Sequence, residues 1–325
     1  FKIAKKKNFN NKLKIYNNFD NLDKIFKKKI DFTMSAISGI KGLKPTVNSI
    51  KYTKKIAIAN KESIICGWPL IVKNLKKFKT DFIPVDSEHF SIWSLINSIK
   101  DINIEKIIIT ASGGPFNNYP LNKFKKITPK IALKHPNWKM GKKISIDSAT
   151  MMNKVFEIIE AKKIFNINYD KLSILVHPKS YVHAIVKFKN GLTKILIHDT
   201  NMTIPIFNSI YPNFEKKIDS KSINLSLLNN LNLKKIDKKR FPILKILNYL
   251  PEKHSLFETV IVSANDQLVN MFLDKKIRFT DIPKVMLKII NSKEFIKYKK
   301  ITPKNIDQIT QLSHYVSLKI NSIRV

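Results

Sequence analysis

The feature that most constrains the fold is an alternation of short apolar runs with amphipathic stretches in the first half of the chain. Residues 54–60 (KKIAIAN), 80–86 (TDFIPVD) and 105–111 (EKIIITA) have the length and composition of buried strands, and helical spacing fills the intervals. Strands that alternate with helices are typical of an α/β sheet. We therefore expect an α/β fold here.

The later part of the chain changes character. A good hairpin turn, Asn190–Gly191, joins two runs of strand type, so the middle is expected to be mixed α/β with an antiparallel pair. Residues 211–240 are polar and poorly periodic, which is typical of a connecting arm with short helices. From 241 to 325 the spacing is helical only, which predicts a C-terminal α-helical bundle.

Composition excludes several classes of protein. The longest uncharged run, Thr200 to Phe214, is broken by Asn and Pro and is shorter than the roughly 18 to 20 apolar residues of a membrane span. No signal-peptide core can form among the lysines and asparagines at the start of the chain. The single cysteine, Cys66, excludes an internal disulfide and a Cys-based zinc site. We expect a cytoplasmic protein without a membrane partner.

The formal net charge of +36 raises the alternative of a basic protein that binds nucleic acid or another polyanion. The lysines are, however, spread from Lys2 to Lys319 instead of clustering on one segment. Drift toward Lys, Asn and Ile, the residues that AT-rich codons encode, accounts for this pattern equally well. We therefore expect no nucleic-acid partner, although a positive field would help to attract anionic ligands.

Four sequence blocks carry candidate chemistry. In PVDSEHF, Asp86 and Glu88 stand two apart at the end of an expected strand, where residues i and i+2 of extended chain point to one side. Both carboxylates could then bind one hard cation. Two acids at a strand end are more often a solvated turn, so this block is weak by itself.

The second block, residues 141–165, is interpreted as strand (ISID), turn and a helix from about Ala149 to Ile164. In this interpretation Ser148 caps the helix and could seat a phosphate there. Asn153, Glu157 and Glu160 would share one helix face, which without a ligand is simply the solvated side of an amphipathic helix.

The third and fourth blocks are loops. In ITASGGPF a strand runs into Ser112 and two adjacent glycines, which allow backbone amides to approach an anion or merely form a tight turn. HPNWKMGKK carries His135, Trp138 and Met140; a Trp on such a loop can serve as a lid, though burial in its own domain is commoner.

These blocks and ANKES (59–63), in this order and at these separations, resemble the 1-deoxy-D-xylulose 5-phosphate reductoisomerase family over nearly the whole chain. The resemblance implies NADPH-dependent rearrangement and reduction of 1-deoxy-D-xylulose 5-phosphate to 2-C-methyl-D-erythritol 4-phosphate, in non-mevalonate isoprenoid biosynthesis. It also implies a homodimer. The alternatives are an inactive paralogue that only binds sugar phosphate, and the polyanion-binding protein.

By this resemblance, Asp86, Glu88 and Glu157 chelate one Mg²⁺ or Mn²⁺, and Glu160 braces their helix. Trp138 and Met140 belong to a lid. The positions that match NADPH contacts are Asn60, Glu62 and Gly141. The positions that match substrate contacts are Lys61, Ser87, Glu88, Ser112, His135, Ser148, Asn153, Lys154 and Glu157.

The resemblance also implies a domain division: 1–85 as the later part of a Rossmann-like NADPH domain, 86–210 as the catalytic metal and substrate domain, 211–240 as the arm, and 241–325 as the helical domain. The family's GxTGSIG phosphate loop is absent from the sequence, so we expect a fragment that lacks the start of its cofactor domain. Two further departures are Val155 in place of a usual Gly, which could crowd the substrate, and Asn201 in place of an acid.

Overall fold

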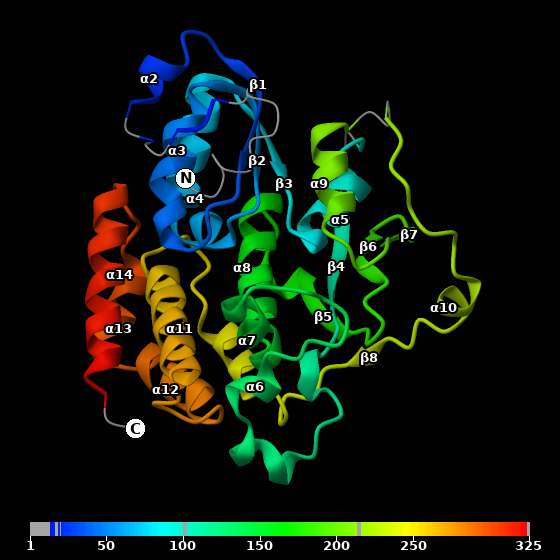
Figure 1. The fold of residues 1–325 in the computed structure, drawn as a ribbon, viewed down its shortest axis with the longest axis vertical. Coiled ribbons are helices and arrows are strands. Elements are labelled where there is room, and N and C mark those ends of the chain that lie inside the picture. Colours follow the sequence, from blue (N-terminus) through cyan, green and yellow to red (C-terminus); the bar gives the residue numbers. More distant parts are fainter. Residues whose placement is uncertain (1–13, 17–18, 20, 100–102, 213–215, 324–325) are drawn as a thin grey trace.

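The structure, a computed structural model, describes residues 14–16, 19, 21–99, 103–212 and 216–323 (Figure 1). The strands are β1 (Ile30–Ser35), β2 (Thr53–Ile58), β3 (Asp81–Pro84), β4 (Ile104–Ala111), β5 (Leu172–Val176), β6 (Val182–Phe188), β7 (Thr193–Ile197) and β8 (Lys234–Lys235). The α-helices are α2 (Leu22–Ile25), α3 (Leu43–Ile50), α4 (Lys61–Phe78), α5 (Ser87–Ile96), α6 (Pro129–Ala132), α7 (Lys142–Thr150), α8 (Met152–Phe165), α9 (Thr203–Ile210), α10 (Leu225–Asn229), α11 (Phe257–Leu273), α12 (Asp281–Ile290), α13 (Lys293–Ile296) and α14 (Ile306–Asn321). Short 3₁₀ helices are η1 (Ile40–Gly42), η2 (Gly114–Phe116), η3 (Leu121–Lys126), η4 (Tyr169–Lys171), η5 (Pro242–Tyr249) and η6 (Lys297–Lys300).

The strands form two sheets. The first is parallel, with the order β1-β2-β3, and α3 and α4 provide its crossovers. The second is mixed, with the order β7-β6-β4-β5-β8, in which β5 is parallel to β4 and β6 is antiparallel to it. The three strands expected in the first half are confirmed as β2, β3 and β4, and the Asn190–Gly191 hairpin is confirmed between β6 and β7.

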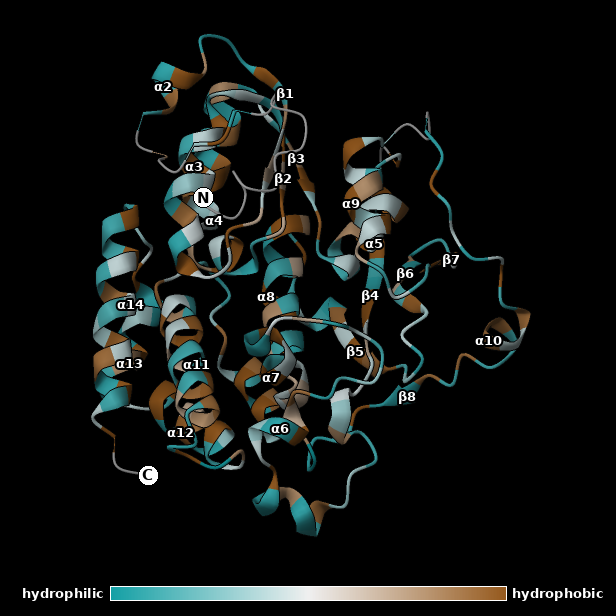
Figure 2. Cartoon of the chain, in the orientation of Figure 1, coloured by the Kyte–Doolittle hydropathy of each residue, from teal (hydrophilic) through white to brown (hydrophobic). Residues whose placement is uncertain are grey.

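The second half of the chain also has the kinds of secondary structure that the sequence predicts. In the described part of the polar arm the regular elements are α10 and the two-residue strand β8, and from Phe241 onward every described element is helical. In Figure 2 hydrophilic and hydrophobic residues alternate along the outermost helix α14. Its buried residues recur at helical spacing, so one side packs on the core and the other faces solvent. No helix in the described ranges is long and apolar enough to cross a membrane.

The strand expected at residues 144–147 is wrong, because these residues lie inside α7. An alternation of four residues fits a helix turn as well as a strand. The ion pair between Lys143 and Asp147, 3.3 Å apart and four residues apart in sequence, supports the helical conformation. The chain then turns at Met151, in the left-handed region at φ 70°, and restarts as α8.

Helix α8 lies at the centre of the molecule (Figure 1) and is shared by two hydrophobic clusters. Met152, Phe156 and Ile159 belong to the large cluster that also contains α4 and the C-terminal helices. Ile158 and Ala161 belong to a second cluster against the mixed sheet. A helix that buries apolar residues on two sides has one narrow stripe left for polar residues, and that stripe faces the candidate site.

The C-terminal end of α8 is attached to α11 by a buried ion pair. Lys163 Nζ lies 2.8 Å from Glu258 Oε1, and both side chains are almost fully buried. The neighbouring His254 ring also contacts the Lys163 ammonium, and burial together with this ammonium lowers the pKa of His254 to about 3. His254 is therefore neutral in the folded protein at pH 7.

This histidine predicts an acid-sensitive contribution to stability. In the unfolded chain His254 has a pKa near 6.5, so below that pH only the unfolded state takes up the proton. The contribution is complete above about pH 6.5 and is lost progressively as the pH falls toward 3, amounting to about 2 kcal/mol by pH 5. Urea titrations at pH 7 and pH 5 should show a smaller decrease in unfolding free energy for His254→Gln than for wild type; equal decreases would contradict this assignment.

Candidate metal and sugar-phosphate site

The first carboxylates of the site lie where β3 ends and α5 begins. Asp86 is the N-cap of α5, and its side chain accepts a hydrogen bond from the Glu88 amide at 3.4 Å. The expected extended conformation of Asp86 and Glu88 is therefore wrong: Glu88 lies in the first helical turn. The helix start nevertheless favours both anions, because its free amides carry partial positive charge.

Helix α8 supplies the third carboxylate. Asn153, Glu157 and Glu160 lie on one face as predicted, and Asn153 Nδ2 donates to Glu157 Oε1. Asp86, Glu88 and Glu157 each offer an oxygen within 4.8 Å of the other two, although they come from two separate helices. Such an all-oxygen set is suited to a hard divalent cation.

Two buried lysines lie among these carboxylates. Lys61, in the first turn of α4, has its Nζ 2.8 Å from Asp86 Oδ2 and 2.6 Å from Asn153 Oδ1. Lys154 Nζ contacts Glu88 and lies 2.5 Å from Glu157 Oε2. Both side chains are only 8% exposed, so their charges act through a poorly solvated medium.

The protonation of the carboxylates follows from this arrangement. Burial opposes ionisation of Asp86, but the ammonium of Lys61 and the ring of His89 together outweigh it and hold the pKa of Asp86 well below its usual range. Burial and the neighbouring Glu88 raise the pKa of Glu157 to about 8. A divalent cation bound beside this carboxyl would favour its ionised form, because the positive charge opposes the effect of burial and of Glu88.

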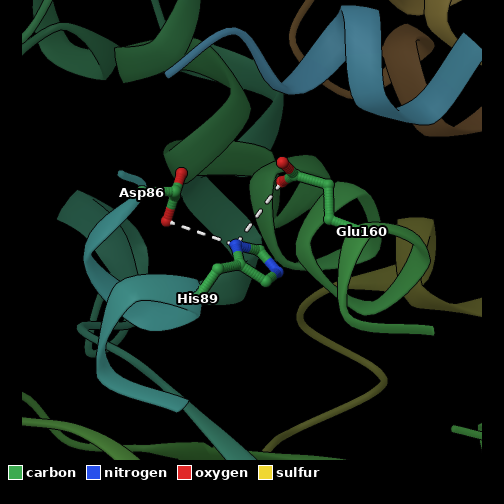
Figure 3. A group of neighbouring side chains, drawn as sticks. All are labelled: Asp86, His89 and Glu160. Carbon is green, nitrogen blue, oxygen red and sulfur yellow. Dashed lines mark ion pairs between the residues drawn. The ribbon is translucent and has the colours of Figure 1, made fainter. Parts of the chain in front are cut away.

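A second group shares Asp86 with the first, and Figure 3 shows the His89 ring lying between Asp86 and Glu160. His89 Nδ1 lies 3.8 Å from both Asp86 Oδ1 and Glu160 Oε2, and its Nε2 lies 2.9 Å from the Glu157 backbone oxygen. Burial disfavours a charged ring, yet the carboxylates of Glu160 and Asp86 raise the pKa of His89 to about 9. The cationic ring thus bridges α5 and α8 behind the metal-ligand candidates.

The loop after β4 presents a hydroxyl to the same cavity. His135 Nδ1 accepts the amides of Asn137 and Trp138, at 3.2 and 2.9 Å, so its proton is on Nε2. That Nε2 donates to Ser112 Oγ at 3.1 Å, and the Gly114 amide donates to the same oxygen at 3.0 Å. The Ser112 hydroxyl hydrogen is therefore left to donate to an anion.

Ser148 also reaches this cavity, but not as a helix cap. It lies in the last turn of α7, and α8 begins at Met152 without a side-chain cap. The cavity measures about 230 Å³. The predicted residues that line it are Lys61, Asp86, Ser87, Glu88, Ser112, His135, Trp138, Met140, Ser148, Asn153, Lys154 and Glu157.

Gly114 allows the loop that carries Ser112 to pack closely against α7. It has φ +61°, and a Cβ built on it would lie 2.9 Å from the Ser148 carbonyl oxygen. We expect Gly114→Ala to lower the unfolding free energy by about 1 to 3 kcal/mol, because both the backbone conformation and the close approach are violated. Thermal unfolding checks this, with Gly191→Ala, on an open hairpin turn with nothing within 4 Å, as the control for positive φ alone. Equal losses would show that the contact with α7 is unimportant.

The lid loop, defined as residues 133–141 between α6 and α7, covers one side of the cavity. Asn137 anchors it by donating to Pro178 O at 2.6 Å and to Ser180 Oγ at 2.8 Å. Trp138 contacts His183 edge to face at 6.1 Å, and His183 stacks on His198 at 3.6 Å.

His183 and Met202, which also line the cavity, were not predicted. Both come from elements far from the motif blocks, and a single sequence carries no signal that places them here. His183 is buried in β6, where residues 182–186 are all buried, so its place in the strand does not distinguish it from a core residue.

The predicted cofactor positions lie beside the cavity and do not line it. Asn60 caps α4 by accepting from the Ser63 amide at 2.6 Å, and it donates to Gly39 O at 2.8 Å. Glu62 is paired with Lys143, and Gly141 is the N-cap of α7. Asn60 follows the carboxyl end of β2 in the parallel sheet, the edge at which α/β proteins bind nucleotides.

The structure shows the surroundings of the two residues, Val155 and Asn201, that depart from the family pattern. Val155 is fully buried in the large hydrophobic cluster and is not among the residues that line the cavity. Asn201 accepts the Thr203 amide at 2.9 Å just before α9, which needs a side-chain oxygen but no charge.

Family models match three stretches of the chain. Residues 2–67 match 1-deoxy-D-xylulose 5-phosphate reductoisomerase, residues 82–165 match its C-terminal domain, and residues 198–317 match a DXP reductoisomerase C-terminal domain. Among relatives of that name, the Pelagibacter ubique protein is 66% identical over 100% of this chain and 84% of its own length. The Persephonella marina protein is 43% identical over 86% of this chain and 74% of its own length.

Solved structures agree. A DOX-P reductoisomerase in complex with NADPH, fosmidomycin and magnesium superposes with a TM-score of 0.81 at 29% identity, covering 90% of this chain and 75% of its own. The Zymomonas mobilis enzyme in complex with NADPH gives 0.79 at 33% identity, over 90% and 74%. On these matches, the chain belongs to the 1-deoxy-D-xylulose 5-phosphate reductoisomerase family.

Proposed function

We propose that this chain carries out the family reaction, the NADPH-dependent rearrangement and reduction of 1-deoxy-D-xylulose 5-phosphate to 2-C-methyl-D-erythritol 4-phosphate. The observation that carries the proposal is one cavity in which three carboxylates, two buried lysines and an anion-facing serine meet. This combination fits a ligand that is both phosphorylated and rich in hydroxyl oxygens. Neither a nucleic-acid surface nor a simple anion pocket needs the carboxylates.

The divalent cation fits the chain because Asp86, Glu88 and Glu157 offer only oxygen atoms, and these atoms lie close to one another. These three residues would hold Mg²⁺, and Mn²⁺ accepts the same ligands. Bound there, the cation supplies Lewis-acid polarisation of the substrate oxygens, and bound NADPH supplies the hydride. Ser87 and Lys61, at the edges of this set, orient the oxygenated carbons.

The phosphate group is assigned to the other end of the cavity. Ser112, Ser148, Asn153 and Lys154 line it from three separate segments, and Lys154 adds the only full positive charge among them. His135 stays neutral there, because burial and then the charge of Lys154 lower its pKa to about 4. It therefore donates from Nε2 across the physiological range.

We assign to the lid loop the role of excluding water from the cavity. Trp138 and Met140 are the part of the lid loop assigned to this role. Both line the cavity, and Trp138 contacts His183 edge to face. A closed apolar cover strengthens every electrostatic interaction below it. Asn60, Glu62 and Gly141 are assigned to NADPH, whose nicotinamide must approach the cavity from the α4 side.

The test is an assay of NADPH oxidation that depends on both the sugar phosphate and Mg²⁺, with the product identified by mass spectrometry. Calorimetric titration with fosmidomycin, which a structural relative binds with magnesium, tests the cavity without NADPH. No oxidation and no magnesium-dependent titration would refute the proposal. Salt-sensitive binding to duplex DNA that survives Glu157→Gln would favour the polyanion alternative.

We also propose that the protein is a cytoplasmic homodimer. Its sole cysteine, Cys66, is buried and unpaired, which suits a reducing compartment. β7 is an edge strand of the mixed sheet, and Leu192 and Ile195 beside and on it are 60% and 45% exposed. A second copy would cover this edge and its apolar side chains.

Ile195→Lys is expected to convert the dimer into a monomer, because a charge would be placed in the buried centre of the interface. Sedimentation velocity measures the result directly. Leu318→Lys, at an equally exposed position on α14, is the matched control and should leave the mass unchanged. A wild-type monomer, or loss of the dimer in the control alone, would contradict the assignment to β7.

A further inference from the structure

The start of α7 is stabilised in an unusual way. Its N-cap, Gly141, provides no side-chain hydrogen bond, and its first turn contains Lys142 and Lys143 but no acidic residue. Cations at this end of a helix oppose the helix dipole. The charge of Lys143 must therefore be compensated by groups outside α7's first turn.

Three carboxylates provide that compensation. Lys143 Nζ lies 2.5 Å from Glu62 Oε1 on α4, 2.9 Å from Asp266 Oδ1 on α11 and 3.3 Å from Asp147 Oδ2 on α7 itself. The ammonium also lies 5.3 Å from the centre of the Phe156 ring on α8. One side chain thus joins four helices that come from distant parts of the sequence.

The partners of Lys143 are themselves fixed. The side chains of Glu62 and Asp147 are only 8% and 2% exposed. Glu62 also accepts the Gly39 amide at 3.4 Å, and Asp147 accepts from Asn265 Nδ2 at 2.7 Å. A mobile surface lysine would have no such rigid set of acceptors.

The position of this cluster connects two parts of the site. Lys143 is two residues beyond the end of the lid loop, and Glu62 is in the first turn of α4 beside the proposed cofactor positions. The N-terminal half of the lid loop is held separately, by contacts of His135 with Ser112 and of Asn137 with Pro178. The Lys143 cluster is thus the attachment of the C-terminal root.

We propose that Lys143 is a positioning residue that fixes the C-terminal root of the lid loop to the cofactor-facing end of α4. Its ammonium touches neither substrate nor reacting atoms. Through Glu62 it sets the geometry of the NADPH contact, and through α7 it sets where Trp138 and Met140 lie. The expected effect on NADPH binding rests on the proposed function, whereas the expected effect on the lid loop does not.

The structural test needs no ligand. Lys139 is exposed in the lid loop and provides a trypsin site. In Lys143→Met, limited proteolysis of the full chain should cleave after Lys139 at least about fivefold faster than in wild type, because local opening of the root exposes the loop. Lys143→Arg, which keeps the charge, should remain within twofold. Lys187→Met, which removes an exposed pair with Glu105, is the matched control.

The ligand test is equilibrium titration with NADPH followed by fluorescence. Lys143→Met should raise the Kd for NADPH at least about tenfold, and Lys143→Arg should restore it. If Lys143→Met does not fold, Lys143→Gln combined with Asp266→Asn removes the surplus negative charge and should still open the lid. Cleavage and NADPH affinity equal to those of Lys187→Met would overturn the proposal. Absent NADPH binding in wild type would instead count against the proposed function, and the proteolysis result would still decide on Lys143.

Discussion

Glu157→Gln is expected to lower kcat/KM by at least about 10³-fold, a loss of about 4 kcal/mol of transition-state stabilisation. The amide keeps the shape of the side chain and its contact with Asn153, but it removes one of three anionic ligands from the candidate cation site. Steady-state kinetics at saturating Mg²⁺ and calorimetric titration with Mn²⁺ measure the loss. The metal affinity and kcat/KM should fall together.

The stability of this variant separates a ligand from a structural residue. Because burial and Glu88 raise the pKa of Glu157 to about 8, the metal-free fold gains little from its charge, and the melting temperature should be unchanged or higher. Glu105→Gln, at an exposed position, is the control for loss of a carboxylate. Retention of more than a tenth of the activity with unchanged Mn²⁺ affinity would show that Glu157 is not a ligand.

Lys154→Met is expected to raise KM for 1-deoxy-D-xylulose 5-phosphate about 100-fold, equivalent to about 3 kcal/mol. The ammonium is buried at the phosphate end of the cavity, where a single charge-assisted hydrogen bond is poorly screened. KM for NADPH should change less than threefold, because Asn60 and Glu62 lie outside this cavity. Initial-rate measurements with each substrate varied in turn give both constants.

Lys162→Met is the matched control on the same helix, since Lys162 pairs with the exposed Glu252 outside the site. It should leave both KM values unchanged. A Lys154→Met variant whose two KM values rise by the same factor would show general damage to α8 instead of loss of a phosphate contact. A substrate analogue without the phosphate should bind wild type and variant equally.

Local sequence pattern was sufficient for the parts of the fold that depend on it. The strands β2, β3 and β4, the Asn190–Gly191 hairpin and the helical C-terminal region each have a period that only one kind of element fits. The polar face of α8 was likewise predicted, because Asn153, Glu157 and Glu160 are spaced by one helical turn. The assignment of chemistry to these residues came from the family resemblance.

The errors arose where four-residue patterns had to be interpreted alone. Residues 144–147 alternate, yet they are helical because Lys143 and Asp147 pair along the helix and the chain reverses only at Met151. Asp86 and Glu88 converge through a helix start and not through extended chain. His183 and Lys143 could not have been predicted, because their partners come from elements that are distant in sequence.

The burial of α8 on two sides has a consequence for how this sequence can vary. The chain is rich in lysine and has a net charge of +36, and replacement by a charged or polar residue is tolerated mainly where solvent can reach it. From Lys154 to Ala161 every residue of α8 is buried: against one of the two apolar clusters, against the cavity or, for Glu160, near His89. Compositional drift therefore has no solvent-exposed position between Lys154 and Ala161, and the carboxylate Glu157 lies within this buried stretch.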